Sequence, residues 1–210
     1  AAQARTPEII GEAPAMQEVF RAIGRLSHSN ITVLINGESG TGKELVAHAL
    51  HRHSPRAAAP FIALNMAAIP KDLMESELFG HEKGAFTGAV ARRIGKFEEA
   101  TGGTLLLDEI SEMDVRLQSK LLRAIQERVI DRVGGAKPVP VNIRIIATSN
   151  RNFGDAVREG SFREDLFYRL NVLNLEVPPL RERREDIPLL ADTMLKRLAE
   201  GSGLPAARLS

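Results

Sequence analysis

The segment Gly37-Glu-Ser-Gly-Thr-Gly-Lys43 contains residue types that suit the binding of a phosphate group. Its glycines allow backbone N–H groups to turn toward an anion, and the start of a following helix adds partial positive charge. Lys43 is placed to reach the β- and γ-phosphates of a nucleotide. The alternative is a glycine-rich turn with a surface lysine, but a predicted strand precedes the segment and a predicted helix follows it. The expected ATP contacts are Gly37, Glu38, Ser39, Gly40, Thr41, Gly42, Lys43 and Glu44.

The residue after the lysine departs from the general pattern of such loops. A Ser or Thr hydroxyl usually binds Mg²⁺ at this position, whereas this chain has Glu44. A carboxylate there could touch the metal through water or point elsewhere, and the sequence leaves both possibilities open.

Two adjacent acids, Asp108 and Glu109, end the apolar segment that begins at Leu105. The carboxyl ends of buried parallel strands are where α/β sheets bind ligands. We expect Asp108 to hold Mg²⁺ and Glu109 to polarise a water molecule for attack on the γ-phosphate. The alternative is a helix N-cap followed by first-turn acids. Together with the phosphate-binding segment, the pair favours a hydrolytic site.

Polar residues at other strand ends are further candidates. Ser149 and Asn150 follow a predicted strand and could detect the γ-phosphate, and Asn65 could hold Glu109 away from its water. Each could equally be a strand-end cap.

Arg163 and Arg169 could act as arginine fingers from a neighbouring subunit. From the sequence alone, pairing with local acids such as Glu164 or Asp165 is favoured.

Alternating strands and helices predict a parallel sheet with helices on both faces. The clearest helix is expected from Val115 to Val129, and another from Ile187 to Leu198, broken by the glycines at 201 and 203. A domain boundary is placed near Pro178, which gives an α/β unit over 1–178 and the beginning of a second unit over 179–210. The expected strands are 31–36, 61–64, 104–108, 143–147 and 172–177.

Composition excludes several classes of function. The 210 residues carry 28 Lys and Arg against 27 Asp and Glu, so no electrostatic bias toward nucleic acid follows. There is no cysteine, which excludes disulfides and thiolate metal sites. No signal peptide and no membrane-spanning run are apparent, and we expect a soluble, cytoplasmic protein with no membrane partner.

A further segment, from Glu77 to Ala89, contains an unusual run of glycines around Phe86 and Thr87. A surface loop with one buried Phe is the simplest interpretation of the residues alone. The run, however, resembles the sigma-contacting loop of bacterial enhancer-binding proteins, which activate RNA polymerase carrying sigma-54. The residues that match this loop are Gly84, Ala85, Phe86, Thr87, Gly88 and Ala89.

The chain as a whole resembles the central AAA+ ATPase domain of that family from about Ile9 to Leu198. The part through Ala89 is most similar to NtrC-type regulators, and the stretch from Gly95 to Pro179 is more similar to FlbD-type regulators. The implied fold is an AAA+ P-loop NTPase with a five-stranded parallel sheet and the start of a C-terminal helical lid.

The resemblance also implies roles for particular residues. It places Ile10 and Gly11 near the adenine, and Glu44 is normal for the family. It makes Asn65 a switch residue and Arg132–Gly135 a second surface loop. Ser149 and Asn150 match the first sensor, and Arg163 and Arg169 match the trans-acting arginines.

By the same resemblance, the chain hydrolyses ATP with Mg²⁺, assembles into a ring that we expect to be a hexamer, and remodels the closed complex of sigma-54 RNA polymerase. DNA would be contacted only through a helix-turn-helix domain that this chain lacks. A preceding receiver domain, typical of two-component systems, and the second sensor arginine are also missing. Two rival hypotheses are a binding module with little turnover and a remodeller of another target, such as a helicase loader.

Overall fold

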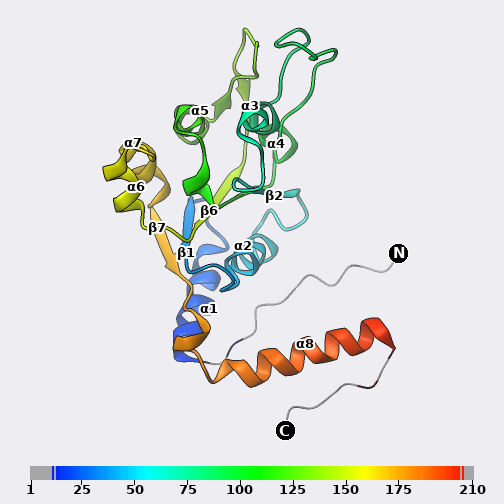
Figure 1. Cartoon of the computed structure of the whole chain (residues 1–210), viewed down its shortest axis with the longest axis vertical. Helices are drawn as coiled ribbons and strands as arrows, with labels where there is room; N and C mark the ends of the chain where they lie inside the picture. Colours follow the sequence, from blue (N-terminus) through cyan, green and yellow to red (C-terminus); the bar gives the residue numbers. More distant parts are fainter. Residues whose placement is uncertain (1–10, 12, 204, 206–210) are drawn as a thin grey trace.

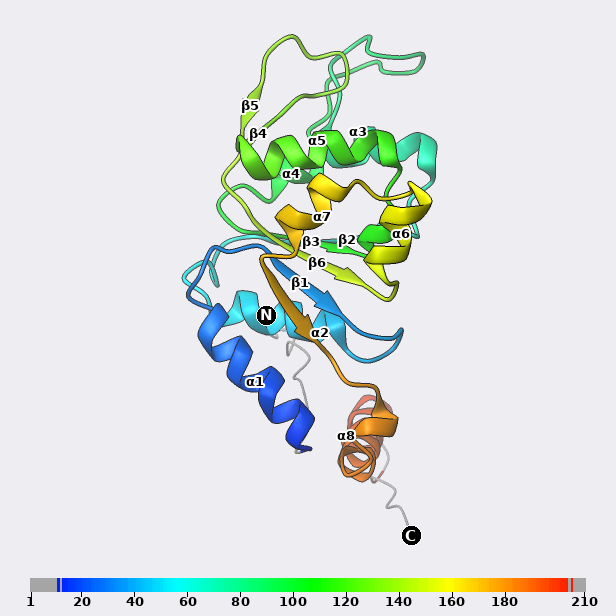
Figure 2. The same cartoon turned by 90° about the vertical axis from the view of Figure 1, so that its left-hand side faces the viewer.

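The computed structural model describes residues 11, 13–203 and 205. Its main feature is a sheet of five parallel strands in the order β2-β3-β6-β1-β7, which confirms the predicted five-stranded parallel sheet (Figures 1 and 2). The strands are β1 (Val33–Asn36), β2 (Phe61–Asn65), β3 (Thr104–Asp108), β6 (Arg144–Ser149) and β7 (Leu173–Glu176).

Helices cover both faces of the sheet, as a parallel sheet with crossover connections requires (Figure 2). The side chains of β3 alternate between the two faces, so Leu105 and Leu107 join one apolar cluster while Leu106 joins the other. The helices are α1 (Pro14–Leu26), α2 (Lys43–Arg52), α3 (Lys71–Phe79), α4 (Lys96–Glu99), α5 (Val115–Gln126), α6 (Phe153–Glu159), α7 (Glu164–Leu170) and α8 (Asp186–Ser202). Of these, α1 and α2 pack on one face, and α3 to α7 pack on the other.

The helix predicted to extend to Val129 is shorter in the structure. α5 begins after Asp114, whose side chain accepts a hydrogen bond from the N–H of Arg116, and it ends at Gln126. Arg128 then adopts a left-handed conformation with φ 57°. This turns the chain, and Val129–Ile130 forms strand β4, which pairs antiparallel with β5 (Val139–Pro140). The prediction failed because an apolar β-branched pair suits either element, and the turn at Arg128 decided between them.

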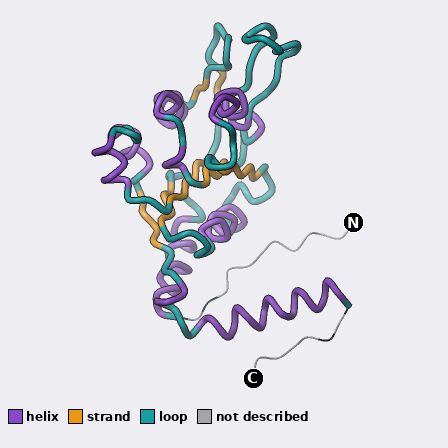
Figure 3. The backbone as a smooth tube through the Cα atoms, viewed as in Figure 1, coloured by secondary structure: helices purple, strands orange, loops and turns teal. Residues whose placement is uncertain are grey.

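Two loops project beside each other from the same end of the molecule (Figures 1 and 3). The first loop, residues 80–95, connects α3 to α4, and the second loop, residues 131–138, connects β4 to β5. Backbone hydrogen bonds join their bases: the N–H of Glu82 donates to Val133 O at 3.0 Å, and the N–H of Val133 donates to Gly80 O at 2.9 Å.

After β7 the chain passes through a short 3-10 turn, η2 (Leu180–Glu182), into α8. The helix predicted to end at Leu198 extends to Ser202. Of the two glycines expected to break it, Gly201 lies within the helix, and the left-handed Gly203 (φ 69°) caps it. The boundary near Pro178 stays a prediction. Among the described residues, no helix is long and apolar enough to cross a membrane.

Candidate functional site

The phosphate loop, residues 37–43, leaves the carboxyl end of β1 and leads directly into α2. Gly40 and Gly42 have φ values of 79° and 94°, in the region that favours glycine. A Cβ at Gly37 would meet Thr41 Oγ1 at 2.9 Å and Val177 O at 3.0 Å, so the loop is too tight there for a side chain. In the described part of the chain, the backbone N–H groups of Gly42 and Lys43 have no hydrogen-bond acceptor. The loop is therefore a backbone cradle whose donors suit an anion.

Lys43 is buried at the base of this cradle, with a relative side-chain exposure of 6%. Its ammonium group donates to Gly37 O at 2.8 Å and lies 3.5 Å from Glu109 Oε1. Lys43 and Glu109 are 66 residues apart in the sequence, and the fold brings them together.

Asp108 and Glu109 stand at the end of β3, and Thr148 of the adjacent strand β6 links them. The Thr148 hydroxyl donates to Asp108 Oδ1 and accepts from the Glu109 N–H at 3.1 Å. Glu109 has φ 55° and ψ 53°, which is a strained conformation for a side-chain-bearing residue. Thr148 therefore holds the Asp108 carboxylate and the backbone of Glu109 in position.

Sequence reasoning missed Thr148. The available signal was a polar residue inside a strand that is buried along its whole length, since such a hydroxyl must find a partner.

The structure places the other predicted polar residues less closely together. Asn65 ends β2 beside Asp108 in the sheet register, but its side chain accepts from the Ala67 N–H at 2.9 Å. No hydrogen bond joins Asn65 to Glu109 in the described residues. Ser149 is buried and its hydroxyl accepts from the Arg151 N–H at 3.1 Å, while Asn150 is exposed.

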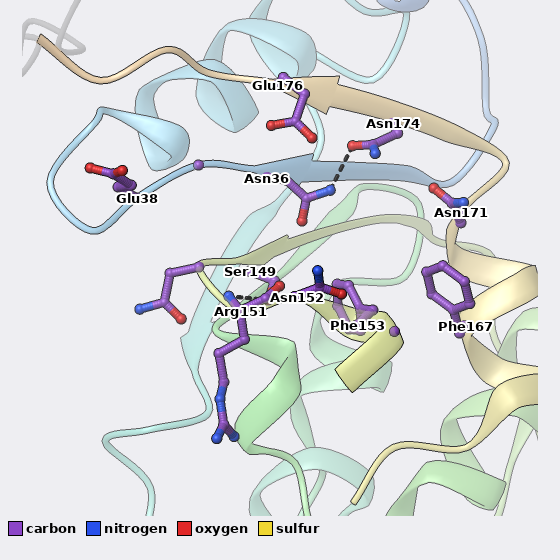
Figure 4. Close-up of a pocket in the computed structure, with 13 residues that line it drawn as sticks. Asn36, Glu38, Ser149, Arg151, Asn152, Phe153, Phe167, Asn171, Asn174 and Glu176 are labelled. Atoms are coloured by element: carbon purple, nitrogen blue, oxygen red, sulfur yellow. Dashed lines mark hydrogen bonds between the residues drawn. The ribbon is translucent and has the colours of Figure 1, made fainter. Parts of the chain in front are cut away.

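Ser149 and Asn150 line a pocket of about 410 Å³ beside the phosphate loop (Figure 4). The other lining residues are Asn36, Gly37, Glu38, Arg151, Asn152, Phe153, Gly154, Phe167, Asn171, Asn174 and Glu176. Lys43, Asp108 and Glu109 are not among them. The pocket thus lies beside the phosphate loop near the ends of β1, β6 and β7, and the acidic pair does not line it.

Arg163 and Arg169 lie on α7 or at its start, and both are exposed. Arg163 donates to both carboxylate oxygens of Asp165, at 3.0 and 2.8 Å. These hydrogen bonds lower the pKa of Asp165 and raise that of Arg163. Arg169 has no ion-pair partner in the part of the chain that is described. Neither arginine contacts the phosphate loop or the acidic pair within this chain.

The predicted sigma-contact residues form the tip of the first loop. Phe86 is 47% exposed and belongs to neither apolar cluster, which excludes the interpretation of a buried Phe. Thr87 and Gly88 are also exposed, whereas Ala89 is buried beneath them. The loop closes on itself through a hydrogen bond from the Gly84 N–H to Ala89 O at 2.9 Å.

His81 anchors the base of the first loop. Its Nε2 lies 3.1 Å from Ala91 O, and its Nδ1 lies 2.6 Å from the Ser76 hydroxyl on α3. Because a carbonyl can only accept, Nε2 carries the proton, and in the neutral ring Nδ1 accepts from Ser76. The Phe86 ring packs edge-on against this imidazole at a centroid distance of 4.9 Å.

Arg132, from the predicted second loop, ties that loop to its surroundings. Its guanidinium donates to Glu98 Oε1 at 2.7 Å and to Glu82 Oε1 at 2.9 Å. These contacts raise the pKa of Arg132, the bonds to Glu98 most. The two loops and α4 are therefore connected by one cation.

The donor set suits ATP with Mg²⁺. The cradle offers backbone N–H groups and one buried ammonium to phosphates. Mg²⁺ in such sites is usually held by one or two carboxylates, waters and the substrate phosphates, and Asp108 supplies one carboxylate. No cluster of three or more His, Cys, Asp or Glu that could hold a metal by itself occurs in the described residues.

The side chain of Glu44 is exposed, and its Oε1 lies 3.8 Å from His48 Nε2, an arrangement compatible with a contact to Mg²⁺ through water. Ile10 lies outside the described residues, and Gly11 is half-buried.

A comparison with known protein families identifies the family to which this chain belongs. Residues 9–176 match the model of the family described as Sigma-54 interaction domain. The chain belongs to this family. It is 67% identical over 204 residues to the DNA-binding transcriptional regulator NtrC of Escherichia coli K12, which covers 97% of this chain and 44% of the relative. It is 64% identical over 197 residues to the transcriptional regulatory protein FlbD of Caulobacter vibrioides, which covers 94% of this chain and 43% of the relative.

Solved structures agree with this family membership. The structure of NtrX from Brucella abortus in complex with ATP superposes with a TM-score of 0.90 at 42% identity, covering 97% of this chain and 44% of NtrX. The predicted AAA+ P-loop NTPase fold is confirmed. The chain spans less than half the length of these relatives.

Proposed function

We propose that this chain binds and hydrolyses ATP with Mg²⁺, and uses the cycle to move its first loop against sigma-54 RNA polymerase, converting closed promoter complexes to open ones. The observation that carries the proposal is the fold's placement of Lys43, Asp108 and Glu109 around one cradle, with Glu109 Oε1 3.5 Å from the Lys43 ammonium. Such work would take place in the cytoplasm, and DNA would be reached only through domains outside this chain.

Each step of the proposed ATP hydrolysis is assigned to particular residues. The backbone donors of the phosphate loop and Lys43 bind and neutralise the phosphates. Mg²⁺, held in part by Asp108, would offset charge on the β- and γ-phosphates when bound. Glu109 accepts a proton from the attacking water. Thr148 keeps the Asp108 carboxylate and the Glu109 backbone in place, because its hydroxyl bonds to both.

In this proposal, the two projecting loops are the segments that move and contact the partner. Glu98 follows the first loop, and Arg132 connects it to Glu82 and to the second loop. A movement of either loop base is therefore transmitted to the other. Phe86, half-exposed in the first loop, is the aromatic side chain of that loop that is available to a partner.

Replacing Phe86 or Thr87 with Ala should abolish capture of sigma-54 while ATP hydrolysis stays near that of the unmodified chain. Neither side chain is near the acidic pair in the structure, and apolar anchors contribute about 2 kcal/mol or more at interfaces. Capture is measured with a transition-state analogue of ATP hydrolysis, alongside the ATPase rate and melting temperature. Val90→Ala, at a residue 83% exposed in the same loop, is the matched control. A Phe86→Ala protein that melts early and hydrolyses no ATP would contradict the contact role.

Arg163 and Arg169 are proposed to complete the site of a neighbouring subunit in a ring, which we expect to be a hexamer. Their exposure and their lack of contact with this chain's own phosphate loop support this role. Arg163 would first have to leave Asp165, an exposed pair that contributes little to stability.

Arg163→Ala and Arg169→Ala should each lower turnover by about tenfold or more, with a smaller effect on ATP affinity, because the guanidinium acts mainly in the transition state. Mixing either variant with a Glu109→Gln variant should restore part of the activity, since some mixed interfaces then carry a complete site. Phosphate release is measured across mixing ratios, with assembly checked by light scattering. Absence of recovery at every ratio in assembled samples would argue against a role in trans.

The rival hypothesis of a binding module is tested on the unmodified chain. Phosphate release that does not rise with protein concentration would favour that hypothesis over an ATPase.

A further inference from the structure

The segment that leads into α8 contacts the phosphate loop from outside. The Arg181 guanidinium donates to both carboxylate oxygens of Glu38, at 2.6 and 2.5 Å. Two residues later, Arg183 Nη2 donates to the backbone oxygen of Thr41 at 2.9 Å. Glu38 and Thr41 are the second and fifth of the seven residues of the phosphate loop, so the two arginines contact it at two separate points.

Of these two contacts, the one from Arg183 is buried. Arg183 is 5% exposed, whereas the side chains of Arg181 and Glu38 are 60% and 56% exposed. The Arg183 guanidinium also donates through Nε to Pro178 O at 3.2 Å. A buried cation that bonds to backbone carbonyls fixes their direction, because leaving either partner unsatisfied is costly. An exposed ion pair exerts a weaker constraint.

The direction of the Thr41 carbonyl determines what the next residue offers to a ligand. The peptide unit is planar and trans, so the C=O of Thr41 and the N–H of Gly42 point in opposite directions. This unit rotates about the ψ angle of Thr41 and the φ angle of Gly42, and Gly42 has positive φ (94°) and no side chain to limit that rotation. The hydrogen bond from Arg183 supplies that restraint, and the Gly42 N–H is one of the donors without an acceptor in the described residues.

We propose that Arg183 is a positioning residue for nucleotide binding: it holds the Thr41–Gly42 peptide so that the Gly42 N–H faces the phosphates, and Arg181 steadies the start of the loop through Glu38. The inference rests on the proposed binding of ATP at the phosphate loop. Since both arginines belong to the connection between β7 and α8, a shift of α8 relative to the sheet changes the phosphate cradle directly. Phosphate affinity and the position of the C-terminal helix are then coupled.

Arg183→Met tests the proposal, because methionine keeps much of the apolar stem and removes every donor. Arg183→Lys retains the charge and a single donating group. Arg184→Met is the matched control, since Arg184 is the exposed neighbour and makes no side-chain hydrogen bond among the described residues. The probe is ADP, with affinity measured by calorimetry and the Gly42 amide signal followed by NMR on ¹⁵N-labelled chain.

We expect Arg183→Met to bind ADP about 10–100-fold more weakly, and the Gly42 amide to lose most of the chemical-shift change that ADP causes in the unmodified chain. Arg183→Lys should recover part of the affinity and part of the chemical-shift change. Arg181→Gln should lose about threefold or less in affinity, and Arg184→Met should behave as the unmodified chain.

Either of two results for Arg183→Met overturns the proposal. One is an ADP affinity like that of the unmodified chain. The other is a full Gly42 chemical-shift change at saturation despite weaker affinity, which would indicate a purely structural role. If Arg183→Met does not fold, the lysine variant decides by the same two criteria. Failure of the unmodified chain to bind ADP would refute the proposed function and is determined before any variant is compared.

Discussion

Glu109→Gln is expected to bind ATP normally and to hydrolyse it about 10²–10⁴-fold more slowly than the unmodified chain. The amide keeps the size of the side chain and the backbone hydrogen bond from the Glu109 N–H to Thr148, but it cannot accept the proton of the attacking water. The left-handed backbone at this position is equally strained in both proteins, so stability should change little. Single-turnover phosphate release and nucleotide titration on the same preparation give the two quantities.

Glu112→Gln is a suitable control for this prediction. Glu112 lies three residues further on, is exposed, and its nearest charged neighbour is Arg151 at 3.8 Å. It should retain the hydrolysis rate of the unmodified chain. Turnover at the unmodified rate in Glu109→Gln would exclude Glu109 as the general base and make Asp108 the next candidate for that role.

Lys43→Ala should remove tight ATP binding, with affinity reduced by about 30-fold to several thousand-fold. Truncating one partner of a buried charged contact costs about 2–5 kcal/mol, and the Lys43 ammonium is buried against the phosphate loop, where it donates to Gly37 O. The change also removes the ammonium next to Glu109, so hydrolysis should be lost as well. Fluorescent-nucleotide titration measures the affinity.

The matched variant for this experiment is Lys71→Ala, at an exposed lysine that begins α3. It should leave nucleotide affinity unchanged. An unaltered affinity in Lys43→Ala, with the melting temperature preserved, would mean that residues 37–43 are not a phosphate site.

Local patterns in the sequence were enough to predict several features. The phosphate loop depends on consecutive residues, so glycine positions and the following helix are visible without any tertiary structure. The same holds for β3, which is apolar until Asp108 because it is buried on both faces. Boundaries were less certain where a β-branched pair such as Val129–Ile130 fits a helix or a strand.

What the sequence by itself determined is therefore the strand, loop and helix that form the nucleotide cradle, and the acidic strand end. The exposure of Phe86 was decided by the structure, since the residues alone favoured a buried Phe. Tertiary structure alone decided the contacts between residues far apart in the chain. Thr148 reaches Asp108 and Glu109 because β3 and β6 are neighbours in the sheet, and Arg183 reaches Thr41 across 142 residues. The physical reason is that a side chain's partners depend on the order of strands and the path of connections, which arise from burial of the whole apolar surface and not from any local spacing.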